Sequence, residues 1–172
     1  MNWLGELVRQ EIGEGDSVLD LGCGTLQATG VLGQRHLAVD CFRPYLDEIK
    51  DRALTLHAFI PLVLEMFPAR SWDVVLLLDV LEHLRKDAAL STLTLAEHVA
   101  RKKVILFTPL GMVAQVGFNY AGFGFNPWQE HRCGFIVSEL EQRGYSCLLH
   151  DNHSLQAGEH KGIYGVRTCT SA

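Results

Sequence analysis

Short apolar runs alternate with helix-length amphipathic segments along most of this chain, and no other feature constrains its fold as tightly. Apolar runs predict strands at residues 17–21, 36–40, 54–59, 72–78 and 104–107, with two short strands at 146–150 and 162–168. Apolar residues at helical spacing predict helices at residues 3–13, 26–33, 44–52, 81–100 and 136–144. This alternation is typical of a parallel sheet whose strands are joined by crossover helices.

The length of the chain fits one domain. Its 172 residues are too few for two full domains, and its 48% hydrophobic and 20% charged residues are ordinary for a globular protein. We therefore predict a single domain over residues 1–172. The N-terminus has no basic region followed by an apolar stretch, so we expect no secretory signal. The longest apolar run, residues 74–78, is too short to span a bilayer.

The cysteines indicate the cellular compartment of the protein, and the net charge indicates which substrates are disfavoured. The chain has 5 cysteines, an odd number, and no Cys-x-x-Cys pair, which favours reduced thiols in a cytoplasmic protein. A formal net charge of −5 provides no basic field for a nucleic acid, so we disfavour nucleic acid as a substrate. The one basic cluster, residues 101–103, is interpreted as the solvated end of a helix.

The most informative stretch is the glycine turn that follows the first predicted strand, at Gly22 and Gly24. Glycine lets the backbone approach a ligand closely, and a helix after the turn would present free amide groups and the positive end of its dipole. In an open α/β sheet, ligands bind beyond the carboxyl ends of the strands, where this turn would lie. A Gly-x-Gly turn alone also fits a plain connection between a strand and a helix.

Asp40 makes a nucleoside ligand the better interpretation. It ends the second predicted strand, where a carboxylate can accept hydrogen bonds from both ribose hydroxyls of an adenosine. The third glycine of a dinucleotide-binding fingerprint is replaced by Gln27. Asp20, just before the turn, would repel a phosphate and attract an amino group. These charges favour a sulfonium amino-acid nucleoside over a dinucleotide.

Three segments together resemble the class I S-adenosylmethionine-dependent methyltransferases. Residues 18–24 resemble the first motif of that superfamily, and residues 67–75 and 78–84 resemble the fourth-strand region of its small-molecule members. Thr108-Pro109 and residues 126–132 are similar to a segment that follows the fifth strand. The resemblance covers residues 15–145. It implies a doubly wound α/β fold: a mostly parallel seven-stranded sheet with helices on both faces and an antiparallel C-terminal hairpin.

The resemblance also implies which residues hold S-adenosylmethionine. Asp20 and the glycine turn would bind the methionine part, Asp40 the ribose, and residues 78–80 the methionine side. The predicted cofactor-binding set comprises Asp20, Gly22, Cys23, Gly24, Asp40, Cys41, Leu78, Asp79 and Val80. One departure from the pattern concerns adenine, because residues 57–61 lack the acidic residue that often binds its amino group. Phe59 in that segment fits the core equally well.

Two histidines are the candidate catalytic residues. His83 follows the fourth strand, and His131 follows the segment rich in glycine and aromatic residues at 110–130. An imidazole with an ordinary pKa of about 6.5 can accept a proton near neutral pH. Each also fits a structural role, His83 in helix packing and His131 as a loop anchor. Asp79, Glu82 and His83 would share one helix face and could hold a divalent ion. Since many similar enzymes with an Asp-led segment lack a metal, we predict none.

Glycines and aromatic residues gather at residues 110–130 without regular periodicity. A long loop of this kind inside a compact domain is usually functional or mobile. Its aromatic side chains offer apolar contact area, so we interpret it as a wall of the acceptor site. A patch for a partner or a membrane surface is the alternative.

These observations predict an enzyme that transfers a methyl group from S-adenosylmethionine to O, N or C of a small-molecule acceptor. The cofactor half is expected at residues 1–84 and the acceptor-side half at 85–172. A non-catalytic methyltransferase-like binding module is one alternative. An NAD-dependent oxidoreductase is another, which Gln27 disfavours. The short segment before the first strand leaves a homodimer open.

Overall fold

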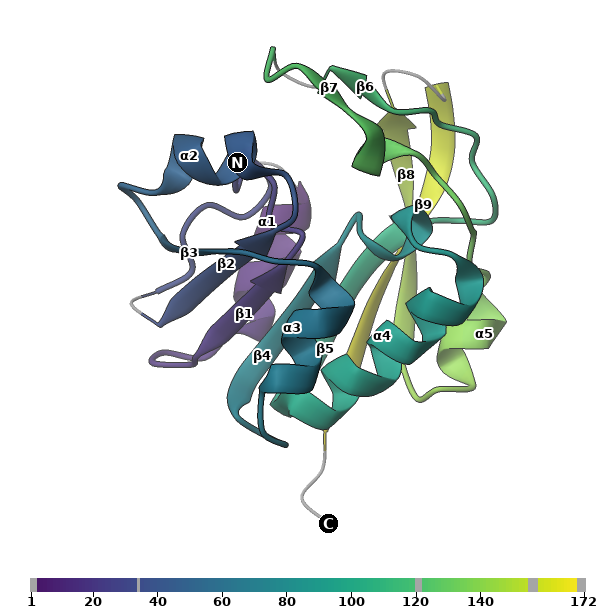
Figure 1. Ribbon diagram of the computed structural model, residues 1–172. Coiled ribbons are helices and arrows are strands. Elements are labelled where there is room, and N and C mark those ends of the chain that lie inside the picture. The colour runs from purple at the N-terminus through teal and green to yellow at the C-terminus, as the bar shows by residue number, and fades with distance from the viewer. Residues whose placement is uncertain (1–2, 34, 120–121, 155–157, 170–172) are drawn as a thin grey trace.

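A seven-stranded sheet forms the centre of the computed structural model, in the order β3-β2-β1-β4-β5-β9-β8 (Figure 1). The structure describes residues 3–33, 35–119, 122–154 and 158–169. The strands of this sheet are β1 (Val18–Leu21), β2 (His36–Asp40), β3 (Leu54–His57), β4 (Trp72–Leu78), β5 (Ala100–Pro109), β8 (Ser146–Ser154) and β9 (Gly158–Thr168). Strands β1 to β5 pair in parallel, whereas β9 pairs antiparallel with both β5 and β8. The predicted sheet and its antiparallel C-terminal hairpin are confirmed.

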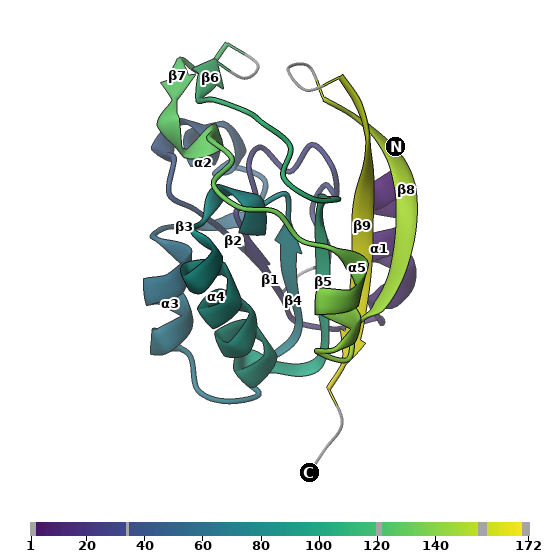
Figure 2. The ribbon, with the colours of Figure 1, turned by 90° about the vertical axis from the view of Figure 1, so that its right-hand side faces the viewer.

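Helices cover both faces of the sheet, as Figure 2 shows edge-on. The helices are α1 (Trp3–Glu11), α2 (Arg43–Ile49), α3 (Ile60–Met66), α4 (Lys86–Val99) and α5 (Val137–Glu141), with 3-10 turns η1 (Leu81–His83) and η2 (Pro127–Gln129). A small second sheet pairs β6 (Phe118–Asn119) with β7 (Phe125–Asn126). The doubly wound arrangement therefore agrees with the sequence pattern.

The two faces of the central strands hold separate apolar layers. On one face, Leu4 and Val8 of α1 pack against Val74 and Leu76 of β4. On the other face, α3, α4 and α5 pack against side chains such as Leu77, one residue further along the same strand. Because successive side chains of a strand point to opposite faces, a strand covered on both sides is apolar throughout. This accounts for the continuous apolar run that marked β4 in the sequence.

The predicted helix at residues 26–33 is wrong. The described residues 22–33 after β1 form a series of turns, with a hydrogen bond from Gly30 N to the Leu26 carbonyl. Leu26 (φ 58°) and Gly30 (φ 64°) both have left-handed backbone conformations, which end an α-helix. Helix α1 contacts this segment, because the Arg9 guanidinium donates a hydrogen bond to the Thr29 carbonyl.

Other element boundaries also differ from the sequence prediction. The predicted helix at 81–100 is divided into η1 and α4, and the fifth strand is much longer than residues 104–107. Helix α3 lies in a segment for which we predicted no helix, with a proline in its first turn as helices tolerate. The predicted helix at 136–144 is shorter, and the C-terminal hairpin strands are longer.

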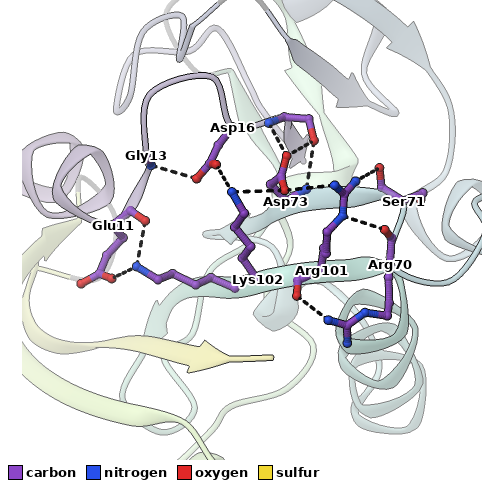
Figure 3. A network of polar contacts seen from close by, with 10 residues as sticks. Glu11, Gly13, Asp16, Arg70, Ser71, Asp73, Arg101 and Lys102 are labelled. Carbon is purple, nitrogen blue, oxygen red and sulfur yellow. Dashed lines mark hydrogen bonds and ion pairs between the residues drawn. The ribbon is translucent and has the colours of Figure 1, made fainter. Parts of the chain in front are cut away.

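The basic cluster at residues 101–103 is not a solvated helix end; it lies at the start of β5 and is ion-paired (Figure 3). Lys102 Nζ contacts the carboxylates of Asp16 and Asp73, and Lys103 Nζ lies 2.8 Å from Glu11 Oε2. The network joins the start of β4, the start of β5 and the turn before β1. It lies at the amino ends of the parallel strands.

Asp73 is the centre of this network. Its carboxylate accepts hydrogen bonds from Ser17 N (3.0 Å) and Ser17 Oγ (2.8 Å) and lies 3.5 Å from Arg101 Nη1. Desolvation alone would raise the pKa of Asp73, but the Ser17 hydrogen bonds and the cations Arg101 and Lys102 hold it below its usual value. The carboxylate therefore ties β1 to β4 at their amino ends.

Two further features of the described residues concern disulfide bonds and membrane-spanning helices. All five cysteines are free thiols. No helix in the described ranges has the length and apolarity needed to cross a membrane.

We predict that Asp73→Ala lowers the free energy of unfolding by about 1–3 kcal/mol at pH 7, because the N–H and O–H of Ser17 lose their buried acceptor. A carboxylate with a lowered pKa contributes stability above its unfolded pKa of about 3.9 and loses it as the pH falls through its folded pKa. The difference between wild type and variant, measured by urea unfolding, should therefore shrink below about pH 4.

Asp47→Ala is the matched control, because Asp47 forms an exposed ion pair with Arg43. It should change the free energy of unfolding by less than about 0.5 kcal/mol. Equal effects of the two substitutions would contradict the role assigned to Asp73.

Candidate active site

The predicted cofactor residues come together where β1, β2 and β4 end. Leu21, the last residue of β1, is in register with Val39 of β2 and Leu77 of β4. The residues that follow these three positions therefore emerge at one edge of the sheet. They are the glycine turn, Asp40 with Cys41, and residues 78–80, as the sequence predicted.

The glycine turn leaves β1 in a conformation that other residues rarely adopt. Gly22 (φ 70°) and Gly24 (φ 53°) are both left-handed, and the N–H groups of Gly22 and Cys23 donate to the Val39 carbonyl. A Cβ on Gly22 would lie 2.5 Å from Val80 Cγ2, so β1 and the end of β4 approach too closely for a side chain. A Cβ on Gly24 would meet no atom within 4 Å. The turn is therefore packed at Gly22 and open at Gly24.

Asp40 faces the open side of this turn. Its Oδ2 accepts a hydrogen bond from Gly24 N (3.0 Å) and its Oδ1 accepts one from Phe42 N (2.7 Å). Burial raises the pKa of Asp40, and these N–H groups oppose that rise. A carboxylate has about four lone-pair directions, so each oxygen retains acceptor capacity for a ligand hydroxyl.

The two cysteines of the predicted set are protonated thiols. Burial raises the pKa of Cys23, and the carboxylates of Asp20 and Asp40 raise it further. Burial and the Asp40 carboxylate raise the pKa of Cys41 to about 11. Neither side chain has the thiolate character that nucleophilic chemistry needs.

Asp20 has a partner that the sequence did not reveal. Its carboxylate is buried, and its Oδ2 lies 3.3 Å from Nε2 of His36. The Nδ1 atom of His36 accepts a hydrogen bond from Leu32 N (3.0 Å), so that nitrogen carries no proton. His36 thus connects the turn segment after β1 to Asp20 and fixes the first acidic residue of the glycine motif.

The end of β4 is strained. Asp79 has a left-handed backbone (φ 53°), which is rare for a residue other than glycine and occurs most often at functional sites. Its side chain is exposed at this edge of the sheet. Desolvation, and next the neighbouring Glu82 carboxyl, raise the pKa of Asp79 well above its usual value.

Glu82 is a buried carboxyl, only 2% exposed, in the turn after β4. Burial raises its pKa to about 7, while hydrogen bonds that include one from Thr108 lower it. Thr108 Oγ1, near the end of β5, donates to Glu82 Oε2 at 3.0 Å. The sequence pattern placed Glu82 on a helix face and gave no sign of its contact with Thr108, because this contact joins two strand ends that are distant in sequence.

His83 and His131, the two candidate catalytic residues, lie side by side. Their ring centroids are 4.9 Å apart. His83 Nδ1 lies 3.2 Å from the Glu130 carbonyl oxygen, and His131 Nδ1 lies 2.7 Å from that of Val113. A carbonyl only accepts hydrogen bonds, so each Nδ1 carries the proton and each Nε2 keeps a lone pair.

Both imidazoles are held neutral. Burial lowers the pKa of His83, and the Arg132 guanidinium lowers it further, whereas hydrogen bonds to the backbone of Glu130 and Asp79 raise it. Burial also lowers the pKa of His131, as do the imidazoles of His83 and His160, against its hydrogen bond to Val113. Near neutral pH each ring therefore offers a basic nitrogen.

The cluster that could hold a metal differs from the set considered in the sequence, for which we predicted no metal. Ligand atoms of Glu82, His83 and His131 all lie within 4.8 Å of one another. The set predicted on one helix face contained Asp79 in place of His131, but residues 81–83 form a 3-10 turn and not an α-helix. His131 joins the cluster from a separate loop.

The segment rich in glycine and aromatic residues at 110–130, here called the aromatic loop, lies at the carboxyl edge of the sheet. It contains the β6–β7 hairpin, which stands above the central strands in Figures 1 and 2. Phe123 packs edge-on against Tyr45 of α2 (ring centroids 5.5 Å apart), and Trp128 packs edge-on against Phe59 (4.9 Å). The loop therefore reaches the side of the sheet that carries Asp40. Phe59 is 47% exposed, so its interpretation as a core residue is wrong.

Comparison with known proteins identifies the fold. No family model matches the sequence, and no curated protein is significantly similar to it. A structure of S-adenosylmethionine-dependent methyltransferases from Methanosarcina mazei is similar with a TM-score of 0.71 and 10% identity, over 96% of this chain and 98% of that one.

Two further solved structures carry bound ligands. The 1,6-didemethyltoxoflavin-N1-methyltransferase of Burkholderia thailandensis, with its substrate and S-adenosylhomocysteine, has a TM-score of 0.63 and 19% identity over 98% of this chain and 77% of that one. The magnesium protoporphyrin IX methyltransferase of Synechocystis, with bound S-adenosylmethionine, has a TM-score of 0.57 and 16% identity over 95% and 76%. This chain therefore has the class I methyltransferase fold.

The contrast between the two turn glycines gives a stability prediction. Gly22→Ala and Gly24→Ala both place alanine in a left-handed conformation, which costs about 1–2 kcal/mol. Only Gly22→Ala also forces a Cβ against buried Val80, and overpacking of this kind adds about 1–3 kcal/mol. Denaturant unfolding should show the larger loss for Gly22→Ala, and equal losses would contradict the close approach of β1 and β4.

Proposed function

We propose that this protein transfers a methyl group from S-adenosylmethionine to a small-molecule acceptor. The observation that supports this best is the position of Asp40, whose carboxylate is held by two backbone N–H groups beside the open Gly24. It keeps acceptor capacity toward the space where a ribose would lie. The solved enzymes with bound S-adenosylmethionine or S-adenosylhomocysteine share this fold.

The charges at the site favour a sulfonium donor over a dinucleotide. Asp20 and Asp40 lie where β1 and β2 end, and their carboxylates would oppose a pyrophosphate there. In addition, the described residues 22–33 form no helix after the glycine turn, so this turn does not lead into a helix N-terminus that could bind phosphate. Both points weaken the interpretation as an NAD-dependent oxidoreductase.

Methyl transfer from a sulfonium is an in-line displacement. The acceptor lone pair forms a bond to the methyl carbon while the carbon–sulfur bond breaks, and S-adenosylhomocysteine leaves with the electron pair on sulfur. The protein has to align the reacting atoms, and an acceptor that loses a proton needs a base nearby. We assign that role to Nε2 of His83 or His131, which are neutral and unprotonated at that atom.

In this proposal the cofactor half is residues 1–84 and the acceptor half is residues 85–172. The aromatic loop that carries Phe123 and Trp128 would form the acceptor wall. A small molecule acceptor suits this wall, whereas a nucleic acid would meet a net charge of −5. A homodimer and a cytoplasmic location stay predictions.

Binding of nucleosides tests the cofactor assignment. We expect calorimetry to show micromolar binding of S-adenosylmethionine and S-adenosylhomocysteine and none of NAD. Asp40→Ala should weaken binding of both sulfur nucleosides more than tenfold, or by more than about 1.4 kcal/mol, because the ribose hydroxyls lose their acceptor.

Asp51→Ala is the matched control, since Asp51 is an exposed carboxylate after α2. It should leave both affinities unchanged. Binding of NAD in place of the sulfur nucleosides would move the oxidoreductase forward. Nucleoside binding without methyl transfer to any acceptor would support a non-catalytic module.

Catalysis is tested by release of S-adenosylhomocysteine with a panel of hydroxyl, amine and carbon acceptors. With the acceptor that reacts, His131→Ala should lower kcat by a factor of about 10²–10⁴ while its affinity for S-adenosylhomocysteine stays at the wild-type value. His98→Ala, which removes an exposed imidazole of α4, should retain full activity. Unchanged kcat in His131→Ala would remove that residue from the mechanism.

A further inference from the structure

We propose that Glu82, His83 and His131 form a binding site for one divalent transition-metal ion. Their ligand atoms lie within 4.8 Å of one another. Two donors at about 2.1 Å from a shared ion are at most about 4.2 Å apart, so small side-chain movements bring all three into coordination. Two imidazoles and one carboxylate form a donor set used by zinc and by first-row transition metals.

The two histidines are already oriented as metal ligands are. A metal-bound imidazole typically donates its other N–H to a carbonyl or carboxylate, which fixes the ring and leaves the ligating nitrogen free. His83 does this through Nδ1 and the Glu130 carbonyl, and His131 does it through Nδ1 and the Val113 carbonyl. Both acceptors are backbone atoms of the aromatic loop or of its flanking segment. The rings are therefore held in place before any ion binds.

Glu82 has hydrogen-bond partners, Thr108 and the Asp79 carboxyl, but no cation beside it among the described residues. Glu82 is 2% exposed, and within the described part of the chain no lysine or arginine forms an ion pair with it. Buried charges in proteins are paired or coordinate metals. Thr108 Oγ1 donates to Glu82 Oε2, as the outer shell of a ligating carboxylate does. A cation between Glu82 and the two imidazoles would compensate this group.

The donor set determines which ion is expected. Mg²⁺ and Ca²⁺ prefer oxygen ligands, whereas imidazole suits Zn²⁺, Co²⁺ and Fe²⁺. In the metal-bound protein Nε2 of both histidines is a ligand, so the histidine base of the proposed function operates only without the ion. Three protein ligands leave coordination positions for water or for an acceptor oxygen, which the ion would activate instead. That last point, unlike the metal site itself, rests on the proposed function.

The test uses untagged, reduced full-length protein that has been stripped with a chelator. Calorimetry with Zn²⁺ and with Co²⁺ should show one ion per chain, and bound Co²⁺ should give a visible spectrum of nitrogen and oxygen ligation. His131→Ala should lower the affinity at least tenfold, and Thr108→Val by a factor of about 10–100 through the outer shell. Circular dichroism checks that both variants are folded.

His98→Ala is the control for surface imidazoles and Cys133→Ser for the nearby thiol; both should bind as wild type does. The absence of stoichiometric binding, or equal affinity in wild type and His131→Ala, would overturn the site. S-adenosylhomocysteine is titrated separately into metal-free protein. If the protein binds the nucleoside but fails to bind the metal, only the metal site is refuted. If it binds the metal but fails to bind the nucleoside, only the proposed function is refuted.

Discussion

The parallel pairing of β1 with β2 on one side and with β4 on the other is the constraint on which the rest of the structure depends. It brings three strand ends to one edge, so that Gly22, Asp40 and Asp79 become neighbours although the sequence separates them. The pairing is itself stabilised at both ends. Asp73 ties the strand starts together, and the close contact of Gly22 with Val80 holds the strand ends. Apolar layers on both faces leave the edge as the place for polar chemistry.

The features that the sequence predicted are those encoded within one short segment. The continuous apolar run of β4 arises because both faces of the strand are covered, and this requirement is visible in residues 72–78 alone. The position of Asp40 followed from its place at the end of a strand. Its hydrogen bonds to Gly24 N and Phe42 N then agree with a carboxylate facing the glycine turn. Local patterns were sufficient for the strands of the parallel sheet, whereas the seven-stranded arrangement with its antiparallel hairpin came from the family resemblance.

The features that the sequence missed depend on contacts between distant segments. His36 read as an ordinary strand residue, and only the register of β1 and β2 brings it to Asp20. His131 joins Glu82 through a loop whose path no periodicity encodes. The absent helix after Gly24 is a different case. There, the alternation of strands and helices led us to predict a helix, although Thr29, Val31 and the glycines of the segment disfavour one.

The carboxylates at the two edges of the sheet differ in whether a lysine or an arginine pairs with them. Lysine and arginine side chains are neutralised in pairs at the amino edge, whereas the carboxyl edge gathers Asp20, Asp40 and Glu82 without a balancing lysine or arginine among the ion pairs of the described residues. If the protein carries out the proposed reaction, an acidic edge of this kind would distinguish a charged donor from its neutral sulfur product. Once the methyl group has left, sulfur carries no positive charge, and the attraction that held the donor weakens. The same carboxylates would therefore promote both loading of the donor and escape of the spent nucleoside.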